Sequence, residues 1–349
     1  MHFIVTGGAG FIGSHLTEQL LSEGHRVTVV DNLTTGRLEN LPKHCHLRFL
    51  QKDILICQPE DFTEKVDGIA HLAAISSVTE SLCRPLEAHH NNLSATLAVI
   101  QLCQALTIPK LVFASSASVY GNLTQLPISE EQKTSPMSPY GLQKLVSEQY
   151  ASMFAKQLGF SFVGLRIFNV FGPRQVPNSS YSGVISRFID IIQRGLPITI
   201  YGDGTQTRDF IYVKDVVRAF SQALKVNITS GSSLICNLGT GTSTSLVQLI
   251  NILKNHFPRW KPEINFASPR AGDIQHSQAD ISRISSCLDF QPQWSAESAI
   301  VFLIASSLSN KENYSKQRLT LSAQDLENEN CIVNKKLLNK YLSKNEVFI

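Results

Sequence analysis

The chain contains 349 residues, of which 43% are hydrophobic and 17% are charged. This composition is typical of a soluble globular protein, and the length suits one large α/β unit with an added lobe. Lysine and arginine outnumber aspartate and glutamate by only 31 to 28, so the chain lacks the basic surface of a nucleic-acid-binding protein. No apolar run reaches the ~20 residues of a membrane span, and no signal peptide is recognisable. We expect a cytoplasmic protein that binds neither nucleic acid nor membrane.

The cysteines are scattered and form no CxxC pair, which argues against a disulfide framework and against a zinc site. We therefore expect reduced thiols and no metal. The seven are Cys45, Cys57, Cys83, Cys103, Cys236, Cys287 and Cys331.

Short β-branched runs alternate with amphipathic stretches in the first half of the chain. This alternation predicts βαβ units, and hence a doubly wound parallel sheet of the Rossmann type with helices on both faces. The expected strands are 2–6, 26–31, 47–50, 68–72, 110–115 and 160–166, and the expected helices are 11–23, 93–106 and 140–158.

Beyond about residue 172 the pattern loosens into turns rich in proline, glycine and serine, which predicts a smaller α/β lobe. We divide the chain into a Rossmann domain (1–171), a substrate lobe (172–309) and a polar tail (310–349). The segments 216–224 and 246–257 still have a helical pattern, so parts of the later chain are candidates to rejoin the sheet. The tail composition favours a solvated segment over a partner-binding helix, and its role is open.

A glycine-rich turn follows the first expected strand and opens the first helix. Gly7, Gly10 and Gly13 leave room for a pyrophosphate to approach backbone N–H groups at a helix N-terminus. Asp31 ends the next strand, eighteen residues after Gly13, where a dinucleotide fold needs an acid to accept hydrogen bonds from ribose. That acid favours NAD over NADP, although the nearby Arg37 weakens the preference.

Three side chains form a candidate catalytic set. Ser116 ends an expected strand, and Tyr140 and Lys144 occupy positions i and i+4 of an expected helix, so they share one face. A free phenol has a pKa of about 10 and is a poor base at neutral pH unless a cation stabilises its phenolate. Lys144 is placed to supply that cation, and Ser116 to bridge the phenol and a substrate hydroxyl.

Together these motifs resemble the extended short-chain dehydrogenase/reductase family of NAD-dependent sugar-nucleotide epimerases and dehydratases, over roughly residues 1–305. The strings that carry the resemblance begin with the glycine loop and end with the segment 165–174, Leu-Arg-Ile-Phe-Asn-Val-Phe-Gly-Pro-Arg. The resemblance implies tightly bound NAD and a homodimer made by the helices 93–106 and 140–158. It also implies that the cofactor contacts Gly7, Gly10, Phe11, Ile12, Gly13, Asp31, Asn32, Asp53, Ile54, Ala73, Ala74, Asn92, Tyr140, Lys144 and Phe168.

The same resemblance extends to the substrate, a UDP-sugar. Arginine side chains offer forked donors to a diphosphate, and the family pattern assigns this role to Arg208 and Arg270. The other expected substrate contacts are Ser116, Asn169, Val184, Tyr201, Asp273 and Ser277.

The reaction is narrowed by Ser118, which stands where dehydratases and decarboxylases of the family keep an acid. Elimination of water requires groups that remove and donate protons, so we predict a 4-epimerase that forms a transient 4-keto sugar. The small residue at Ser277 resembles the pattern of epimerases that act on UDP-N-acetylglucosamine or its uronic acid. UDP-glucose is the alternative substrate.

Two further alternatives remain open at this stage. One is a dehydratase, a decarboxylase or a reductase that releases NAD in each turnover. The other is a non-catalytic NAD-binding regulator on the same fold, which has no need of the set Ser116, Tyr140 and Lys144.

Overall fold

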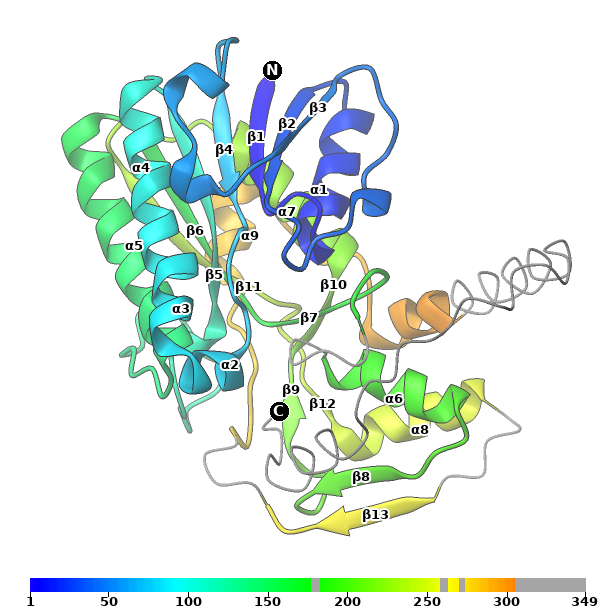
Figure 1. Cartoon of the computed structure of the whole chain (residues 1–349). Helices are drawn as coiled ribbons and strands as arrows, with labels where there is room; N and C mark the ends of the chain where they lie inside the picture. Colours follow the sequence, from blue (N-terminus) through cyan, green and yellow to red (C-terminus); the bar gives the residue numbers. More distant parts are fainter. Residues whose placement is uncertain (177–182, 258–262, 270–273, 305–349) are drawn as a thin grey trace, which may run out of the picture.

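The computed structural model describes residues 1–176, 183–257, 263–269 and 274–304 (Figure 1). Its centre is a parallel sheet of seven strands in the order β11-β6-β5-β4-β1-β2-β3. The expected doubly wound fold is therefore confirmed. The strands are β1 (His2–Thr6), β2 (Arg26–Asp31), β3 (Leu47–Gln51), β4 (Gly68–His71), β5 (Lys110–Ser116), β6 (Ser161–Ile167) and β11 (Ser233–Leu238).

Helices cover both faces of this sheet (Figure 1). Phe3 and Val5 of β1 belong to the apolar cluster that includes α1 (Phe11–Ser22) and α7 (Val213–Lys225). Ile4 belongs to a second cluster with α4 (Ala95–Ala105) and α5 (Pro139–Leu158). Alternate residues of a strand point to opposite faces, so an unbroken apolar strand anchors two helical layers.

The helix α5 carries clear boundary signals. Ser138 caps its first turn by accepting a hydrogen bond from the backbone N–H of Gly141 at 3.1 Å, and Pro139 occupies the first helical position, where its missing N–H costs nothing. Gly159 ends the helix with a φ of 79°, a conformation that glycine adopts without strain. Upstream, α2 (Val78–Cys83), α3 (Pro85–His89) and the π-helical turn η4 (His90–Ser94) lead into α4.

Part of the chain beyond residue 172 lies in the first lobe. α7 packs against α1, and β11 adds the seventh strand beside β6, in register from Ser233 opposite Phe162. α9 (Ser282–Leu288) packs on β11. The chain therefore crosses between the lobes several times, and the segment 216–224, a candidate to rejoin the sheet, lies in α7 against the first lobe.

The second lobe lies beyond the carboxyl ends of the strands (Figure 1). Its elements are α6 (Val184–Gln193), α8 (Leu246–His256), the parallel pairs β8 (Ile198–Tyr201) with β13 (Ile264–Ala267) and β7 (Asn169–Phe171) with β10 (Phe210–Tyr212), and the antiparallel pair β9 (Thr207–Arg208) with β12 (Thr244–Ser245).

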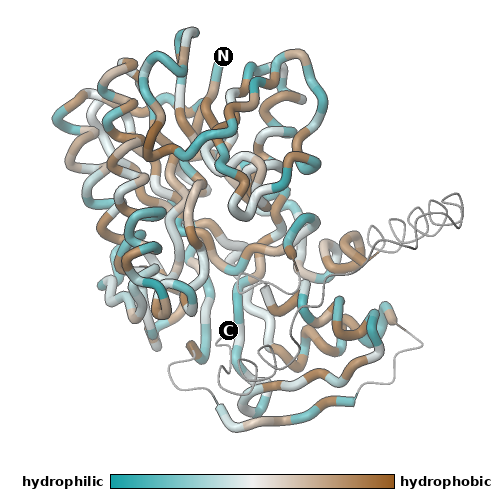
Figure 2. The backbone as a smooth tube through the Cα atoms, viewed as in Figure 1, coloured by the Kyte–Doolittle hydropathy of each residue, from teal (hydrophilic) through white to brown (hydrophobic). Residues whose placement is uncertain are grey.

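Hydropathy alternates between polar and apolar along the helices of both lobes (Figure 2). Such alternation is what a helix needs when one side packs on a core and the other faces water. Within the described ranges, none of the helices has the length and apolar character that crossing a membrane requires. The short helices η1 (Leu38–Asn40), η2 (Ile54–Ile56), η3 (Pro59–Asp61) and η5 (Ala117–Val119) lie in connections.

Candidate active site

A cavity of ≈ 1660 Å³ lies between the two lobes, at the carboxyl ends of the parallel strands. Its lining comes from both sides, from the glycine loop and Asp31 of the first lobe to Tyr201 and Arg208 of the second. Open α/β sheets bind ligands at this edge, where the strand order reverses. A pocket for one small ligand usually measures about 300–1,000 Å³, so this cavity has room for a cofactor and a second molecule.

The glycine loop has the close backbone packing that a dinucleotide cradle requires. Gly7 has a φ of +67°, and a Cβ there would lie 2.8 Å from the backbone nitrogen of Ala73. A Cβ on Gly13 would lie 2.8 Å from the carbonyl carbon of Gly7. A Cβ on Gly10 would meet only the Gly7 oxygen, at 3.2 Å, so this position is open toward the cavity. The loop therefore fits the pyrophosphate of NAD.

Asp31 connects the glycine loop to the end of β2. Its Oδ2 accepts a hydrogen bond from the backbone N–H of Ala9 at 2.9 Å, and its Oδ1 accepts one from Leu33 at 2.8 Å. Each carboxylate oxygen retains a second lone pair, so the side chain can still accept bonds from ribose hydroxyls. Arg37 is exposed and also lines the cavity.

Asn32 and Asp53 lie side by side on the cavity wall. The amide of Asn32 donates to Asp53 Oδ2 at 2.9 Å, and the other oxygen of Asp53 accepts from the backbone N–H of Leu55 at 2.9 Å. This pairing connects the loops after β2 and β3, with Ile54 beside it on the wall.

Thr6 and His71, which the sequence analysis did not single out, hold the loop after β4. Thr6 Oγ1 lies 2.8 Å from Nδ1 of His71 and accepts a hydrogen bond from the backbone N–H of Ala73 at 3.2 Å. Burial lowers the pKa of His71 to about 3, so the imidazole is neutral and its ring is held between two hydroxyls, those of Thr6 and Thr96. These contacts fix the backbone that carries Ala73 and Ala74.

Asn92 does not line the cavity itself, although it supports one wall. It lies in the π-helical turn η4, and its side-chain oxygen accepts from the backbone N–H of Ile75 at 2.8 Å. Its amide nitrogen donates to the Ile75 carbonyl at 3.1 Å and to Gln143 Oε1 at 2.7 Å. Asn92 therefore clamps the loop after β4 to α5, the helix that carries Tyr140.

The three candidate catalytic side chains meet at the cavity. Ser116 ends β5 and interacts with the phenol of Tyr140, and its Oγ donates a hydrogen bond to Ser118 Oγ at 3.1 Å. Lys144 Nζ lies 5.8 Å from the centre of the Tyr140 ring. Lys144 also donates to the Ala114 carbonyl at 2.8 Å. Burial raises the pKa of Tyr140, which the Ser116 contact partly offsets, and burial lowers the pKa of Lys144 to about 7. The phenol therefore depends on nearby positive charge to act as a base.

A buried polar network lies behind this set. Glu148, one turn after Lys144, accepts from Ser115 and from Arg166, whose Nη2 is 2.8 Å away. Arg166 donates to the Tyr120 hydroxyl at 3.0 Å, and Tyr120 donates to Asn237 at 2.6 Å. The charges of the ion pair are satisfied, and the network joins α5 to β5, β6 and β11.

The second lobe contributes the other expected residues. Asn169, Val184, Tyr201 and Arg208 line the cavity, together with Phe168. Ser277 is buried and does not line it, whereas Ile274 does. Arg270 and Asp273 lie outside the described residues.

Lys52, Arg84, Arg174 and Arg187 line the cavity and were not singled out as site residues, and the last two come from the second half of the chain. Arg174 has a φ of 68° and reaches from the second lobe to Ser14 and Glu18 of α1, at 3.0 and 2.5 Å. Arg187 lies on the cavity side of α6 beside Val184. The helix α6 buries its apolar side, and only the fold shows that its other side borders the cavity.

This geometry is that of an NAD-dependent enzyme of the Rossmann type. The family model for the NAD dependent epimerase/dehydratase family matches residues 3–239, and the chain belongs to this family.

Individual relatives are more specific. A putative UDP-glucose 4-epimerase of Methanocaldococcus jannaschii is 38% identical over 297 residues, which cover 83% of this chain and 93% of that protein. The solved UDP-N-acetylglucosamine 4-epimerase of Methanobrevibacter ruminantium, in complex with UDP-N-acetylmuramic acid, is 36% identical with a TM-score of 0.83 and covers 88% of this chain and 98% of its own. The UDP-glucuronic acid 4-epimerase of Bacillus cereus, solved with UDP-glucuronic acid and NAD, is 30% identical with a TM-score of 0.81, and the match covers 89% of this chain and 100% of that one.

Family membership and the NAD cofactor, both expected from the sequence, are confirmed. These three relatives are named as 4-epimerases, so the expected enzyme class, isomerase, is also confirmed.

Proposed function

We propose that this protein is a UDP-sugar 4-epimerase acting on UDP-N-acetylglucosamine and UDP-N-acetylgalactosamine or on their uronic acids. The observation that carries the proposal is the meeting of Ser116, Tyr140 and Lys144 in one cavity with the glycine loop on one side and Arg208 on the other. A nucleotide-binding module has no need of a buried phenol and ammonium beside a strand-end serine.

The chain's own groups supply binding and proton transfer. The glycine loop and Asp31 would hold NAD, which would supply a reversible hydride acceptor for C4 of the sugar. Tyr140 takes the proton of the C4 hydroxyl while Ser116 orients that hydroxyl. After the 4-keto sugar has rotated to present its other face, Tyr140 returns the proton to the same oxygen. Lys144 holds positive charge near the phenolate and lowers the cost of forming it.

The lining of the cavity supports epimerisation over elimination. Ser118 lines it where dehydratases keep an acid. The carboxylates in the described part of the lining are Asp31, Asp53, Glu80 and Glu87. The first two lie at the ends of β2 and β3, and the last two pair with Arg84. None of these carboxylates comes from the segment around Ser118. This segment therefore supplies no acidic group for the proton transfers at C5 and C6 that elimination requires.

The N-acetylated substrate is proposed from the family resemblance at Ser277, a small buried residue three positions after the cavity-lining Ile274. UDP-glucose and UDP-galactose are the alternative, because a site that admits an acetamido group can also admit a hydroxyl. The substrate of the Methanobrevibacter relative belongs to the N-acetylated class.

Tyr140→Phe tests the reaction. Turnover should fall by about 10²- to 10⁴-fold, the usual contribution of one acid–base group, because only the phenol oxygen is removed. The wild type should convert UDP-sugar without added NAD and without lasting absorbance of reduced cofactor, as followed by NMR of the anomeric protons. UDP binding by calorimetry serves as the control and should stay within about twofold. Retained turnover would refute the role of Tyr140, and net reduction of NAD would favour a dehydrogenase.

The proposal includes a homodimer in the cytoplasm. All the described cysteines are free thiols, as suits a reducing compartment. The dimer would form through α5, which exposes Leu142, Tyr150 and Met153, with the partly buried Val146 between them, at helical spacing on the side opposite its buried face.

A further inference from the structure

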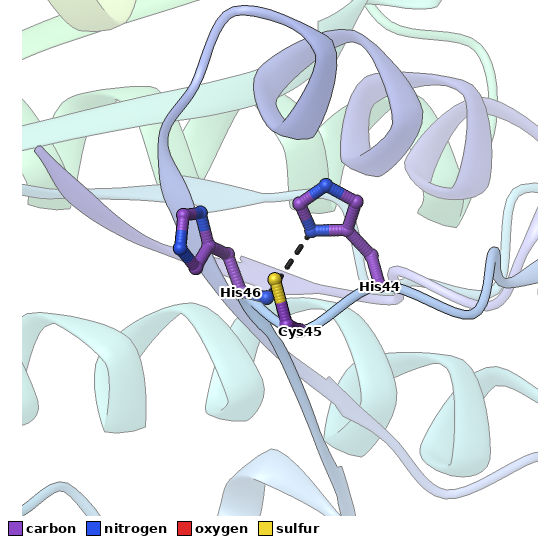
Figure 3. A group of neighbouring side chains, drawn as sticks. All are labelled: His44, Cys45 and His46. Carbon is purple, nitrogen blue, oxygen red and sulfur yellow. Dashed lines mark hydrogen bonds between the residues drawn. The ribbon is translucent and has the colours of Figure 1, made fainter.

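A group of metal-ligating side chains lies outside the cavity, in the connection before β3. His44, Cys45 and His46 are consecutive and exposed, and one ligand atom from each lies within 4.8 Å of the others. Figure 3 shows the sulfur of Cys45 between the two imidazole rings, whose centres are 5.4 Å apart. From these residues we infer a surface site for a single zinc ion or a similar soft transition-metal ion, a function separate from the proposed epimerase activity.

The kind of ion follows from the ligand set. One thiolate and two imidazoles suit Zn²⁺, Co²⁺, Ni²⁺ or copper, whereas Mg²⁺ and Ca²⁺ prefer oxygen ligands. Zinc bonds of ~2.0–2.3 Å in a tetrahedron bring ligand atoms to ~3.3–3.8 Å from one another. The three side chains need to close by about 1 Å, which exposed rotamers permit, and water completes the fourth position.

Packing does not explain these residues. Cysteine is among the residue types most often buried, yet Cys45 is exposed on a connecting segment. The backbone N–H of His46 donates to Nδ1 of His44 at 3.1 Å. Metal binding at either nitrogen of His44 breaks this hydrogen bond. At an exposed position such a bond contributes only about 1 kcal/mol to stability. Binding also releases the proton of the Cys45 thiol.

The three ligands are consecutive in the sequence, so they do not form the CxxC spacing by which zinc sites are recognised. A strand would direct Cys45 away from both histidines, so the convergence depends on the bent backbone that precedes β3. The cluster lies at the amino end of β3, five residues or ~16 Å from the carboxyl end that meets the cavity. Metal binding should therefore leave the epimerase site untouched.

The test is a zinc titration of the full chain in competition with a chromophoric chelator and with a phosphine reductant present. We expect one Zn²⁺ per chain. His44→Asn, Cys45→Ser and His46→Asn should each weaken binding by more than about tenfold, since even outer-shell changes cost that much. Co²⁺ should give a thiolate charge-transfer band that Cys45→Ser abolishes.

Matched controls are Cys287→Ser, which removes another exposed thiol, and His89→Asn, which disrupts another exposed histidine pair with ring centres 6.4 Å apart. Both should bind zinc like the wild type, and epimerase turnover should be unchanged in Cys45→Ser. Equal zinc affinity in a variant lacking all three ligands would overturn the site. One ion per two chains would also overturn it, in favour of a site shared between copies.

Discussion

At the scale of single residues, burial disfavours the charged forms of two neighbouring groups in the cavity. These are the phenolate of Tyr140 and the ammonium of Lys144. The pKa of Tyr140 is raised, and that of Lys144 is lowered to about 7. Glu148 opposes the effect on Lys144 by favouring its charged form. The site thus holds a cation where burial alone disfavours one, which costs stability and, in the proposed mechanism, serves the phenol of Tyr140.

Lys144→Met should remove this stability cost and, with it, the proposed function of Lys144 in turnover. The folded-state pKa of about 7 is below the usual 10.5, so the unfolded chain binds more protons between these values. The penalty is therefore full below about pH 7 and fades as the pH rises toward 10.5. The variant should gain about 1–4 kcal/mol of unfolding free energy at pH 6, gain less at pH 9.5, and lose turnover.

Urea unfolding of the cofactor-free protein at the two pH values measures this gain. Lys43→Met, at an exposed lysine, is the control and should change neither stability nor turnover. A gain that does not depend on pH would contradict the assigned cause.

Ser277→Tyr should change substrate choice. Ser277 is 8% exposed and follows the cavity-lining Ile274 by three residues, so a ring at this position has to displace its neighbours or reach the cavity. If it enters, turnover of UDP-N-acetylglucosamine should fall at least about tenfold relative to UDP-glucose, because overpacking costs about 1–3 kcal/mol. Competition between the two substrates, followed by NMR, measures the ratio.

Ser277→Ala controls for loss of the hydroxyl and should keep the wild-type ratio. Unchanged thermal stability shows that Ser277→Tyr is folded. An unchanged ratio in the folded variant would exclude Ser277 as a determinant of specificity.

At the scale of elements, the connection from β1 to α1 depends on close backbone approach. Gly8, Gly13 and Gly7 pack so tightly that a Cβ on Gly13 would overlap the Gly7 carbonyl group. The strand, the loop and the helix must shift together to relieve such an overlap. Cofactor affinity is thus a property of how this helix meets its strand.

Gly13→Ala should weaken NAD binding by more than about tenfold, since a displaced loop no longer presents its N–H groups to the pyrophosphate. The amount of NAD that copurifies, and its affinity after removal, measure the effect. Gly68→Ala is a matched control, because its Cβ would meet the flexible end of Leu224 at 3.3 Å, away from the cavity. Equal losses in both variants would indicate general destabilisation.

At the scale of the whole molecule, two lobes enclose the cavity and the chain passes between them repeatedly. Asp209 is one of the fixed points: its carboxylate accepts bonds from Thr240, Gly241 and Ala279 at 2.6–3.0 Å. Burial raises its pKa, and these hydrogen bonds oppose the rise. The second lobe is therefore joined to the sheet by long-range contacts as well as by the chain itself.

The proposed homodimer gives a prediction at this scale. Leu142 and Met153 are 51% and 47% exposed on the outer side of α5. The double variant Leu142→Glu, Met153→Glu should be monomeric by light scattering, since buried charges without partners oppose association. Phe266→Glu, at an exposed apolar residue of β13, should remain dimeric. A monomeric wild type would refute the dimer outright.

Features that lie within one continuous segment of this protein could be predicted from the amino-acid sequence. The alternation of strands and helices, the glycine loop with Asp31, and the i, i+4 pair of Tyr140 and Lys144 are local patterns, and local geometry is enough to interpret them. The expected strand bounds differ from those observed by one residue or none at each end.

Contacts between residues that are distant in the sequence depend instead on how the whole chain folds. The fold brings Thr6 to His71, Asn92 to Ile75 and Arg166 to Glu148, and it returns β11 to the sheet beside β6. These contacts arise from the packing of whole layers, which no periodicity along the chain encodes. The same reason applies to Arg187 and to the cluster of His44, Cys45 and His46, because backbone direction in space decides which side chains face a common point.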